Sequence, residues 1–176
     1  MDGQKRSFLK LKNFLIKSDL GKKQVLQLIE YSKTDPLIKK FTGDSKRFKN
    51  LDAYKNWRKN KKVIYALSDK KNNLLGLIWF SKKESSFGGY PFTFAIRTYA
   101  AARGKGLSKE FMRISFEDFV KSNLYQKDEA RGVWLEVSAD NTPAIKIYQD
   151  FGFKKRGKPN KNNKIMMLMT PNFRPF

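Results

Sequence analysis

The sequence predicts one α/β or α+β layered domain, and three observations lead to this prediction. The chain has 176 residues, of which 40% are hydrophobic and 14% aromatic, so it has enough apolar material for one packed core. Runs rich in β-branched and aromatic residues alternate with segments of helical periodicity. The sequence contains no repeat, low-complexity tract or linker. We therefore expect residues 1–176 to form a single domain around one sheet.

The first half of the chain predicts one strand, three helices and a hairpin. The strand rests on loose alternation of apolar residues, and the helices rest on apolar residues at helical spacing. Asn50 is the expected N-cap of the third helix, and Lys-Lys-Asn-Asn joins the two β-rich runs of the hairpin. The elements are expected at residues 7–16 (strand), 22–33, 35–41 and 50–60 (helices), and 62–69 and 74–83 (hairpin).

In the second half, a Gly- and Ser-rich loop leads to a strand, a helix, a further strand, a further helix and a closing hairpin. The first of these helices has two apolar rows. The second helix has Asn141 as its expected N-cap, Pro143 in its first turn and Gly152 as its stop. The elements are expected at residues 92–100 (strand), 107–119 (helix), 132–139 (strand), 141–151 (helix), and 153–157 and 164–170 (hairpin).

The composition limits the chemistry that the chain can perform. The absence of Cys excludes disulfides, thiolate metal sites and a cysteine nucleophile, and the absence of His removes the commonest base and metal ligand. Acid–base work must therefore fall to Glu, Asp, Lys or Tyr, and no metal is expected. Charges interrupt the first twenty residues every few positions, so neither a signal peptide nor a membrane span fits there. A cytoplasmic location is the resulting expectation.

The formal net charge of +22 draws attention to polyanionic partners. Lysines recur along the whole chain, and only residues 154–164 form a concentrated basic run without an acid. A solvated, lysine-rich surface accounts for this distribution at least as well as a binding role does. Any contact with nucleic acid is expected to be weak and non-specific, because scattered lysines meet phosphates without reading bases.

A short Arg-Gly-Lys-Gly stretch lies between a predicted strand and a predicted helix. Backbone N–H groups at the start of a helix form a cradle for an anion, and Gly104 and Gly106 keep Cβ atoms away from it. The stretch has neither the spacing of a Walker A loop nor the third glycine of the dinucleotide fingerprint. It predicts an anion-binding loop; the alternative is a glycine turn that caps the helix and carries incidental cations.

Two patterns in this part of the chain resemble the GCN5-related N-acetyltransferase (GNAT) family. The first is Gln/Arg-x-x-Gly-x-Gly/Ala, which residues 101–106 match except at the first position, where Ala101 stands. The second is a strand followed by Asn-x-x-Ala-x-x-x-Tyr-x-x-x-Gly-Phe, and it is matched in full by Asn141, Ala144, Tyr148, Gly152 and Phe153. The order of the patterns and the gap between them also fit, and the resemblance is specific over residues 62–169.

The resemblance implies an enzyme that transfers an acetyl group from acetyl-coenzyme A directly to a primary amine of a peptide, a protein or a small molecule. It also implies a mixed, mostly antiparallel sheet of about six to seven strands, flanked by helices. A V-shaped splay is expected between the fourth and fifth predicted strands, at residues 94–98 and 134–138. The alternative is a basic nucleic-acid- or ribosome-associated binding module on the same fold. The oligomeric state does not follow from the sequence.

The resemblance assigns the cofactor to the glycine loop and to the splayed strands. Strand amides near Ile96, Arg97 and Thr98 would hold the pantetheine arm, and the N–H of Ile96 or Arg97 would face the thioester oxygen. Asn141 would hydrogen-bond the arm, serve as a plain N-cap, or do both. Because Ala101 lacks the family's polar side chain, Arg103 or Lys105 would have to compensate. The loop residues implied for the pyrophosphate are Arg103, Gly104, Lys105, Gly106, Leu107 and Ser108.

Two side chains are implied in proton transfer. Tyr148, with a reference pKa near ~10, is a neutral donor at pH 7 that can protonate the departing thiolate. Its alternative role is that of a buried core aromatic. Glu136 precedes Tyr148 by 12 residues (148 − 136), the spacing at which members that resemble ribosomal-protein N-terminal acetyltransferases carry a base. Its alternative role is an ion pair at the sheet surface.

The acceptor amine is constrained by its pKa and its charge. Neutralising an α-amine at pH 7 costs roughly 1 kcal/mol, against roughly 4.6 kcal/mol for a lysine ε-amine. A single glutamate that acts through water therefore suits an α-amine or another amine of low pKa. Polycationic acceptors would approach a chain of charge +22 against a repulsive field.

Overall fold

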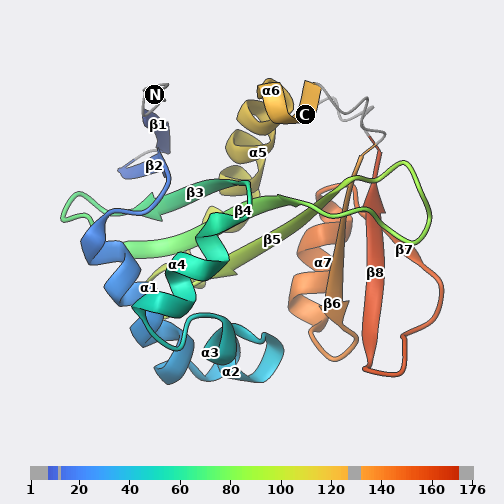
Figure 1. Ribbon diagram of the computed structural model, residues 1–176, viewed down its shortest axis with the longest axis horizontal. Coiled ribbons are helices and arrows are strands. Elements are labelled where there is room, and N and C mark those ends of the chain that lie inside the picture. The colour runs from blue at the N-terminus through green and yellow to red at the C-terminus, as the bar shows by residue number, and fades with distance from the viewer. Residues whose placement is uncertain (1–7, 12, 127–131, 171–176) are drawn as a thin grey trace. The chain divides into compact units, whose positions relative to one another are not determined.

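The computed structural model describes residues 8–11, 13–126 and 132–170. The chain divides into two compact units, of which the first comprises Met1–Trp79 and Ile96–Ile114 and the second Phe80–Ala95 and Ser115–Phe176. Three elements contribute residues to both units (Figure 1). They are strand β4 (Leu74–Lys82), strand β5 (Phe92–Thr98) and helix α5 (Leu107–Val120).

The helices of the first unit begin where the sequence places their caps. The Asp35 carboxylate accepts hydrogen bonds from the N–H groups of Leu37 and Ile38 at 3.0 and 3.2 Å. Asn50 accepts one from the N–H of Ala53 at 2.9 Å, so its predicted role as an N-cap is confirmed. The short α3 was not predicted, because four residues are too few to show a helical period. The helices are α1 (Lys22–Thr34), α2 (Pro36–Phe41), α3 (Asp44–Arg47), α4 (Leu51–Lys59) and the 3-10 turn η1 (Ala100–Ala102).

The strands of the first unit follow the order β1-β2-β3-β4-β5. The first predicted strand is instead a hairpin of β1 (Phe8–Leu11) and β2 (Phe14–Ser18), in which Leu11 faces Phe14. Asn13 lies in its turn, and asparagine is a turn-forming residue, which accounts for the break. β2 then pairs antiparallel with β3 (Lys62–Ser68).

The second unit has the strand order β4-β5-β6-β8-β7. β5 pairs with β6 in parallel at two positions only, Phe92 with Val133 and Thr93 with Trp134, although both strands continue beyond them. This is the predicted splay, and it falls between the fifth and sixth strands because the first predicted strand is a hairpin. The described residues thus form eight strands, against the expected six to seven. The remaining elements are β6 (Val133–Ser138), β7 (Lys154–Arg156), β8 (Lys164–Met169), α6 (Asn123–Gln126) and α7 (Thr142–Asp150).

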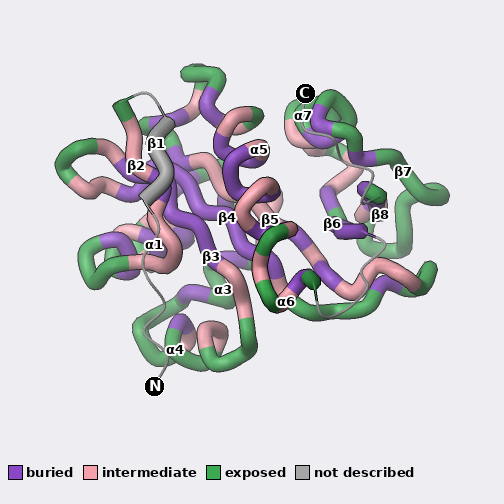
Figure 2. The backbone as a smooth tube through the Cα atoms, turned by 90° about the horizontal axis from the view of Figure 1, so that it is seen from above, coloured by how far each residue is buried: buried purple, intermediate pink, exposed green. Residues whose placement is uncertain are grey.

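Aromatic residues fill the core of each unit, and the buried positions follow β3, β4 and one face of α5 (Figure 2). In the first unit, the ring of Trp57 lies edge-on to Phe48 and Trp79, with ring centroids 5.0 and 5.5 Å apart. In the second unit, Phe80 stacks on Phe119 at 3.8 Å. Such pairs add to the free energy of burial and stabilise the core of each unit.

Candidate active site

The glycine loop lies in the first unit, between the end of β5 and the start of α5. The N–H of Tyr99 donates to the carbonyl of Leu75 at 3.0 Å and fixes the entry to the loop. Gly104 and Gly106 have φ angles of 74° and 66°, in the left-handed region that favours glycine. A Cβ built on either glycine would meet no atom within 4 Å, so the loop is open on that side. The first turn of α5 follows directly, and the N–H groups at the start of a helix point toward such a loop, as an anion cradle requires.

Arg103 is held beside this loop by a buried acid. Its Nη2 atom donates to the Asp35 carboxylate at 2.7 Å, and Asp35 is only 7% exposed. Within the described residues, the other N–H groups of this guanidinium have no partner. Sequence reasoning missed Asp35, because 68 residues separate it from Arg103.

The first family pattern also fits this loop in a second frame. Shifted by two residues, the pattern reads Arg103, Gly106 and Ser108, so the cationic position is filled and Ser108 is the only departure. In that frame the fourth position, Gly106, immediately precedes α5, which begins at Leu107. The shifted frame removes the need to compensate for Ala101.

The end of β5 is braced by side chains on both sides. Thr98 Oγ1 lies 3.2 Å from Ser108 Oγ, which joins the strand to the first turn of α5. The Arg97 guanidinium binds the carboxylate of Asp44 with two nitrogens, donates to the carbonyl of Ile96 at 2.9 Å and lies 4.8 Å from the ring centroid of Trp79. The side chain of Arg97 is therefore structural, and the predicted role of its backbone N–H stays a prediction.

Asp44 is the most deeply buried acid of this region, with 0% exposure. It also accepts from Arg47, three residues further along α3. Burial raises the pKa of Asp44, but the attraction and hydrogen bonds of Arg97 and Arg47 outweigh burial and hold its pKa below the usual value. A carboxylate that stays charged between two arginines fixes α3 to the end of β5.

In the second unit, Tyr148 lies on α7 and is 8% exposed. Its ring centroid is 6.3 Å from that of Phe94 on β5 and 5.8 Å from that of Phe153. Asn141 accepts a hydrogen bond from the N–H of Ala144 at 3.3 Å, so its predicted role as an N-cap is confirmed. Gly152, at a φ of 109°, ends the helix as the sequence predicts. The proposed contact of Asn141 with the cofactor stays a prediction.

Glu136 lies in β6 and is exposed, whereas Leu135 and Val137 beside it are buried. Its carboxylate accepts one weak hydrogen bond, from Asn160 Nδ2 at 3.4 Å. Among the described residues it forms no ion pair, so the alternative role as half of a surface ion pair is not realised. An exposed carboxylate on an otherwise buried strand is available to a ligand.

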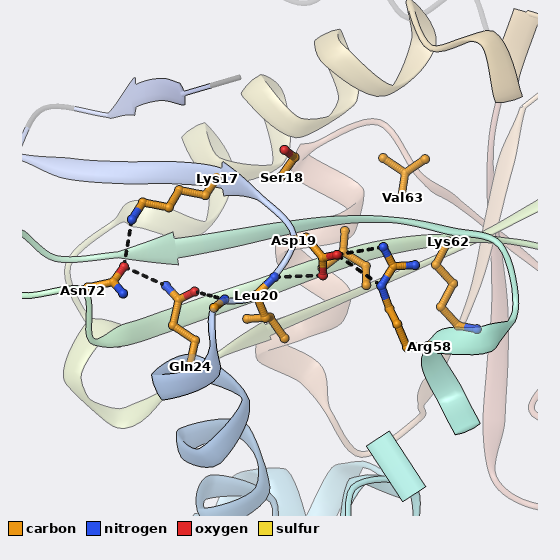
Figure 3. A pocket seen from close by; sticks show the side chains of 11 residues that line it. Lys17, Ser18, Asp19, Leu20, Gln24, Arg58, Lys62, Val63 and Asn72 are labelled. Carbon is orange, nitrogen blue, oxygen red and sulfur yellow. Dashed lines mark hydrogen bonds and ion pairs between the residues drawn. The ribbon is translucent and has the colours of Figure 1, made fainter. Parts of the chain in front are cut away.

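A separate pocket of about 380 Å³ lies in the first unit, between the ends of β2 and β3 and the helices α1 and α4 (Figure 3). Two of its cations bind other lining residues: Arg58 Nη2 donates to the Asp19 carboxylate at 2.8 Å, and Lys17 Nζ donates to the Asn72 amide oxygen at 2.9 Å. Burial, together with the nearby Arg58 and Arg47, lowers the pKa of Lys62, whose Nζ caps the end of α4. The pocket shares no residue with the glycine loop.

No group of three or more acidic residues, histidines or cysteines is placed to hold a metal ion in the part of the chain that the structure describes. Within that same part, none of the helices has the length and apolar character needed to cross a membrane.

Several solved structures of acetyltransferases have the same fold as this chain. The spermidine N-acetyltransferase from Vibrio cholerae, in complex with CoA and spermine, has a TM-score of 0.66 at 16% identity over 90% of this chain and 94% of its own. The ribosomal-protein-S5-alanine acetyltransferase from Vibrio fischeri has a TM-score of 0.63 at 11% identity over 96% and 100%. A ribosomal L7/L12 α-N-protein acetyltransferase has a TM-score of 0.66 at 10% identity over 94% of each chain.

The sequence comparisons identify the family directly. No curated protein matches the chain. The family model described as the acetyltransferase (GNAT) family matches residues 27–153. This range contains both patterns and all of the predicted site residues, and enzymes of the family use acetyl-coenzyme A as the donor. Because the match extends over more than half of its length, the protein belongs to the acetyltransferase (GNAT) family.

Proposed function

We propose that this protein transfers the acetyl group of acetyl-coenzyme A directly to a primary amine. The observation that carries the proposal is the loop of Gly104 and Gly106, where two left-handed glycines leave an open face at the start of α5. That loop suits the pyrophosphate, because amides and a helix terminus attract phosphate without a dedicated side chain. Arg103, fixed by Asp35, adds a cation beside it.

The chain's own residues divide into those that bind and those that move protons. The loop from Arg103 to Ser108 would hold the pyrophosphate, and the backbone of Ile96, Arg97 and Thr98 would hold the pantetheine arm. Asn141 would add a hydrogen bond to the arm. The cofactor supplies a thioester, from which the acceptor nitrogen takes the acetyl group as the C–N bond forms and the C–S bond breaks.

Tyr148 and Glu136 are proposed for the two proton steps. Tyr148 would donate its hydroxyl proton to the departing thiolate, since a phenol is neutral at pH 7. Glu136 would accept the proton of the acceptor amine through water, which its exposure permits. A glutamate with no cationic partner needs no ion pair to be broken before it acts.

The acceptor amine and the cellular location of the protein are also proposals. By their descriptions, the solved neighbours are a spermidine N-acetyltransferase, a ribosomal-protein-S5-alanine acetyltransferase and a ribosomal L7/L12 α-N-protein acetyltransferase. We favour an α-amine, because its neutralisation costs roughly 1 kcal/mol, against roughly 4.6 kcal/mol for a lysine side chain. A single domain of residues 1–176 and a cytoplasmic location stay predictions. So does weak, non-specific contact with nucleic acid, whose affinity should fall steeply with salt.

The test compares two glycine variants. Calorimetry with coenzyme A and thiol release from acetyl-coenzyme A with an amine panel are measured for the wild type, Gly106→Val and Gly43→Val. Gly43 matches Gly106 in having open space around a built Cβ, but its φ is −93°, outside the left-handed region. Gly106→Val should lose most of its affinity and Gly43→Val should keep it. Failure of the wild type to bind coenzyme A would refute the proposal.

The role of Glu136 is tested by its pH response. Glu136→Gln should slow turnover most at low pH, where few amines arrive neutral, and raising the pH should partly restore the rate, because solvent then removes the proton. The measurement is the pH profile of kcat/KM for the wild type and the variant. A variant with an unchanged profile would remove Glu136 from the proton path.

A further inference from the structure

In the second unit, Glu136 and Arg156 lie on the same face of the sheet, in one row across three strands. Glu136 on β6 pairs directly with Met166 on β8, and Met166 pairs directly with Arg156 on β7. Directly paired residues of antiparallel strands point to the same face, so the three side chains share one side of the sheet. The Cα atoms of Glu136 and Arg156 are two strand spacings apart, about 10 Å.

Further cations lie on the same face. Lys154 on β7 pairs with Leu168, which pairs with Trp134, and Lys164 on β8 pairs with Ser138. Lys154 and Arg156 are exposed and Lys164 is half-buried. None of these three cations has an acidic partner among the described residues. The face thus has one carboxylate at its β6 edge and unpaired positive charges on the other two strands.

A hollow of about 290 Å³ opens beside these cations. Its lining includes Lys154, Lys155 and Arg156, the phenol of Tyr90 and the exposed Thr170. Among the residues that the structure describes, no carboxylate lines it. Such a hollow suits an anion, because the cations of Lys154 and Arg156 and two hydroxyl groups can share its charge.

We propose that this face selects a peptide acceptor whose amino terminus is followed closely by an acidic residue. The α-amine would lie at Glu136 and the acidic side chain at Arg156 and Lys154; this rests on the proposed acetyl transfer at Glu136. An extended peptide advances about 3.3–3.6 Å per residue, so a span of roughly 10 Å is an advance of two to three residues and places the acid at the third or fourth residue. A free amino acid is too short to reach both groups.

The same charges act against polyamines. A polycation whose first amine lies at Glu136 would bring its next amine toward Arg156 and Lys154, and like charges at a recognition surface suppress binding. The spermidine N-acetyltransferase from Vibrio cholerae shares the fold. This chain should nevertheless acetylate an acidic peptide in preference to spermidine.

The experiment uses three peptides that differ only at the third residue, which is Glu, Gln or Lys, together with spermidine. The rate of thiol release gives kcat/KM for each acceptor with the full chain. The wild type should prefer the Glu peptide to the Lys peptide by about tenfold, with the Gln peptide between them. Arg156→Glu should invert this order, and Arg156→Gln should flatten it. A thermal melt confirms that each variant is folded.

The matched control is Lys161→Glu, which makes the same change of charge in the exposed turn between β7 and β8. It should keep the wild-type order of acceptors. Equal rates for the three wild-type peptides, a preference for spermidine, or the same inversion in Lys161→Glu would overturn the inference. If the wild type neither binds coenzyme A nor acetylates any acceptor, the proposed acetyl transfer is refuted, and this inference with it.

Discussion

The arginine-bound acids of the first unit and the basic run of residues 154–164 in the second unit use their charges in opposite ways. In the first unit Asp44, Asp35 and Asp19 each bind an arginine, and the first two of these acids are buried. In the second unit, the six cations of residues 154–164 have no acidic partner among the described residues, and Glu136 has no cation. Paired buried charges fix the backbone around the glycine loop, whereas unpaired exposed charges are free to meet a ligand. The position of a charge therefore decides whether it serves the fold or the substrate.

This contrast would fail if the buried ion pairs of the first unit contributed little to the free energy of unfolding. Asp44→Ala leaves Arg97 and Arg47 without their shared carboxylate, so we expect a loss of about 3–5 kcal/mol in the free energy of unfolding. Chemical denaturation measures it. Asp52→Ala is the matched control, because Asp52 is exposed and its Oδ1 atom lies 3.9 Å from Lys55 Nζ. This substitution should change the free energy of unfolding by less than about 0.5 kcal/mol. Equal effects of the two substitutions would contradict the account.

The pH dependence of stability tests whether Asp44 is charged in the folded protein. The pKa of Asp44 is lowered in the folded state, so its stabilising contribution is present above its unfolded pKa of about 3.9 and is lost as the pH falls through the folded value. The stability difference between the wild type and Asp44→Asn should therefore be constant near neutrality and shrink below about pH 4. Unfolding curves at several pH values measure it, and a difference independent of pH would be inconsistent with a charged Asp44.

A smaller effect is expected where a buried pair meets the glycine loop. Asp35→Asn keeps the cap of α2, since asparagine is an equally good N-cap, but releases Arg103. We expect the affinity for coenzyme A to fall by about threefold, because Arg103 is no longer held beside the loop. In an Arg103→Gln background the same substitution should have no effect on affinity. Calorimetry on the four proteins of this cycle measures the coupling, and equal effects in both backgrounds would show that Asp35 does not act through Arg103.

The smallest effect belongs to the half-exposed pair of Asp19 and Arg58. Asp19 has a φ of 72°, and Asn tolerates this left-handed conformation, so Asp19→Asn removes the charge without adding backbone strain. The free energy of unfolding should fall by about 0.5 kcal/mol. A loss as large as that of Asp44→Ala would remove the distinction between buried and exposed pairs.

The sequence was sufficient wherever a local pattern decides the structure. Asn50 and Asn141 are N-caps as predicted, and the glycines before α5 are left-handed. Long-range contacts could not be predicted in this way. Asp44 and Arg97 are 53 residues apart, and nothing in their local sequence marks them as partners.

In the candidate site, too, local patterns were predicted and long-range contacts were not. The sequence indicated Glu136 by its spacing from Tyr148, but the exposure of Glu136 and its row with Arg156 depend on the register of three strands. The hairpin of β1 and β2 was missed because loose alternation continues across its turn. Register and pairing arise from the packing of whole elements, which periodicity does not specify.

The most direct test of the central claim, acetyl transfer with Tyr148 as the acid, is the turnover of Tyr148→Phe. The substitution keeps the ring packed against Phe94 and Phe153 and removes one hydroxyl. The account predicts that kcat falls by roughly 10²-fold or more while the affinity for coenzyme A and the melting temperature stay close to those of the wild type. Full turnover in a folded Tyr148→Phe protein would contradict the assignment of Tyr148 as the proton donor.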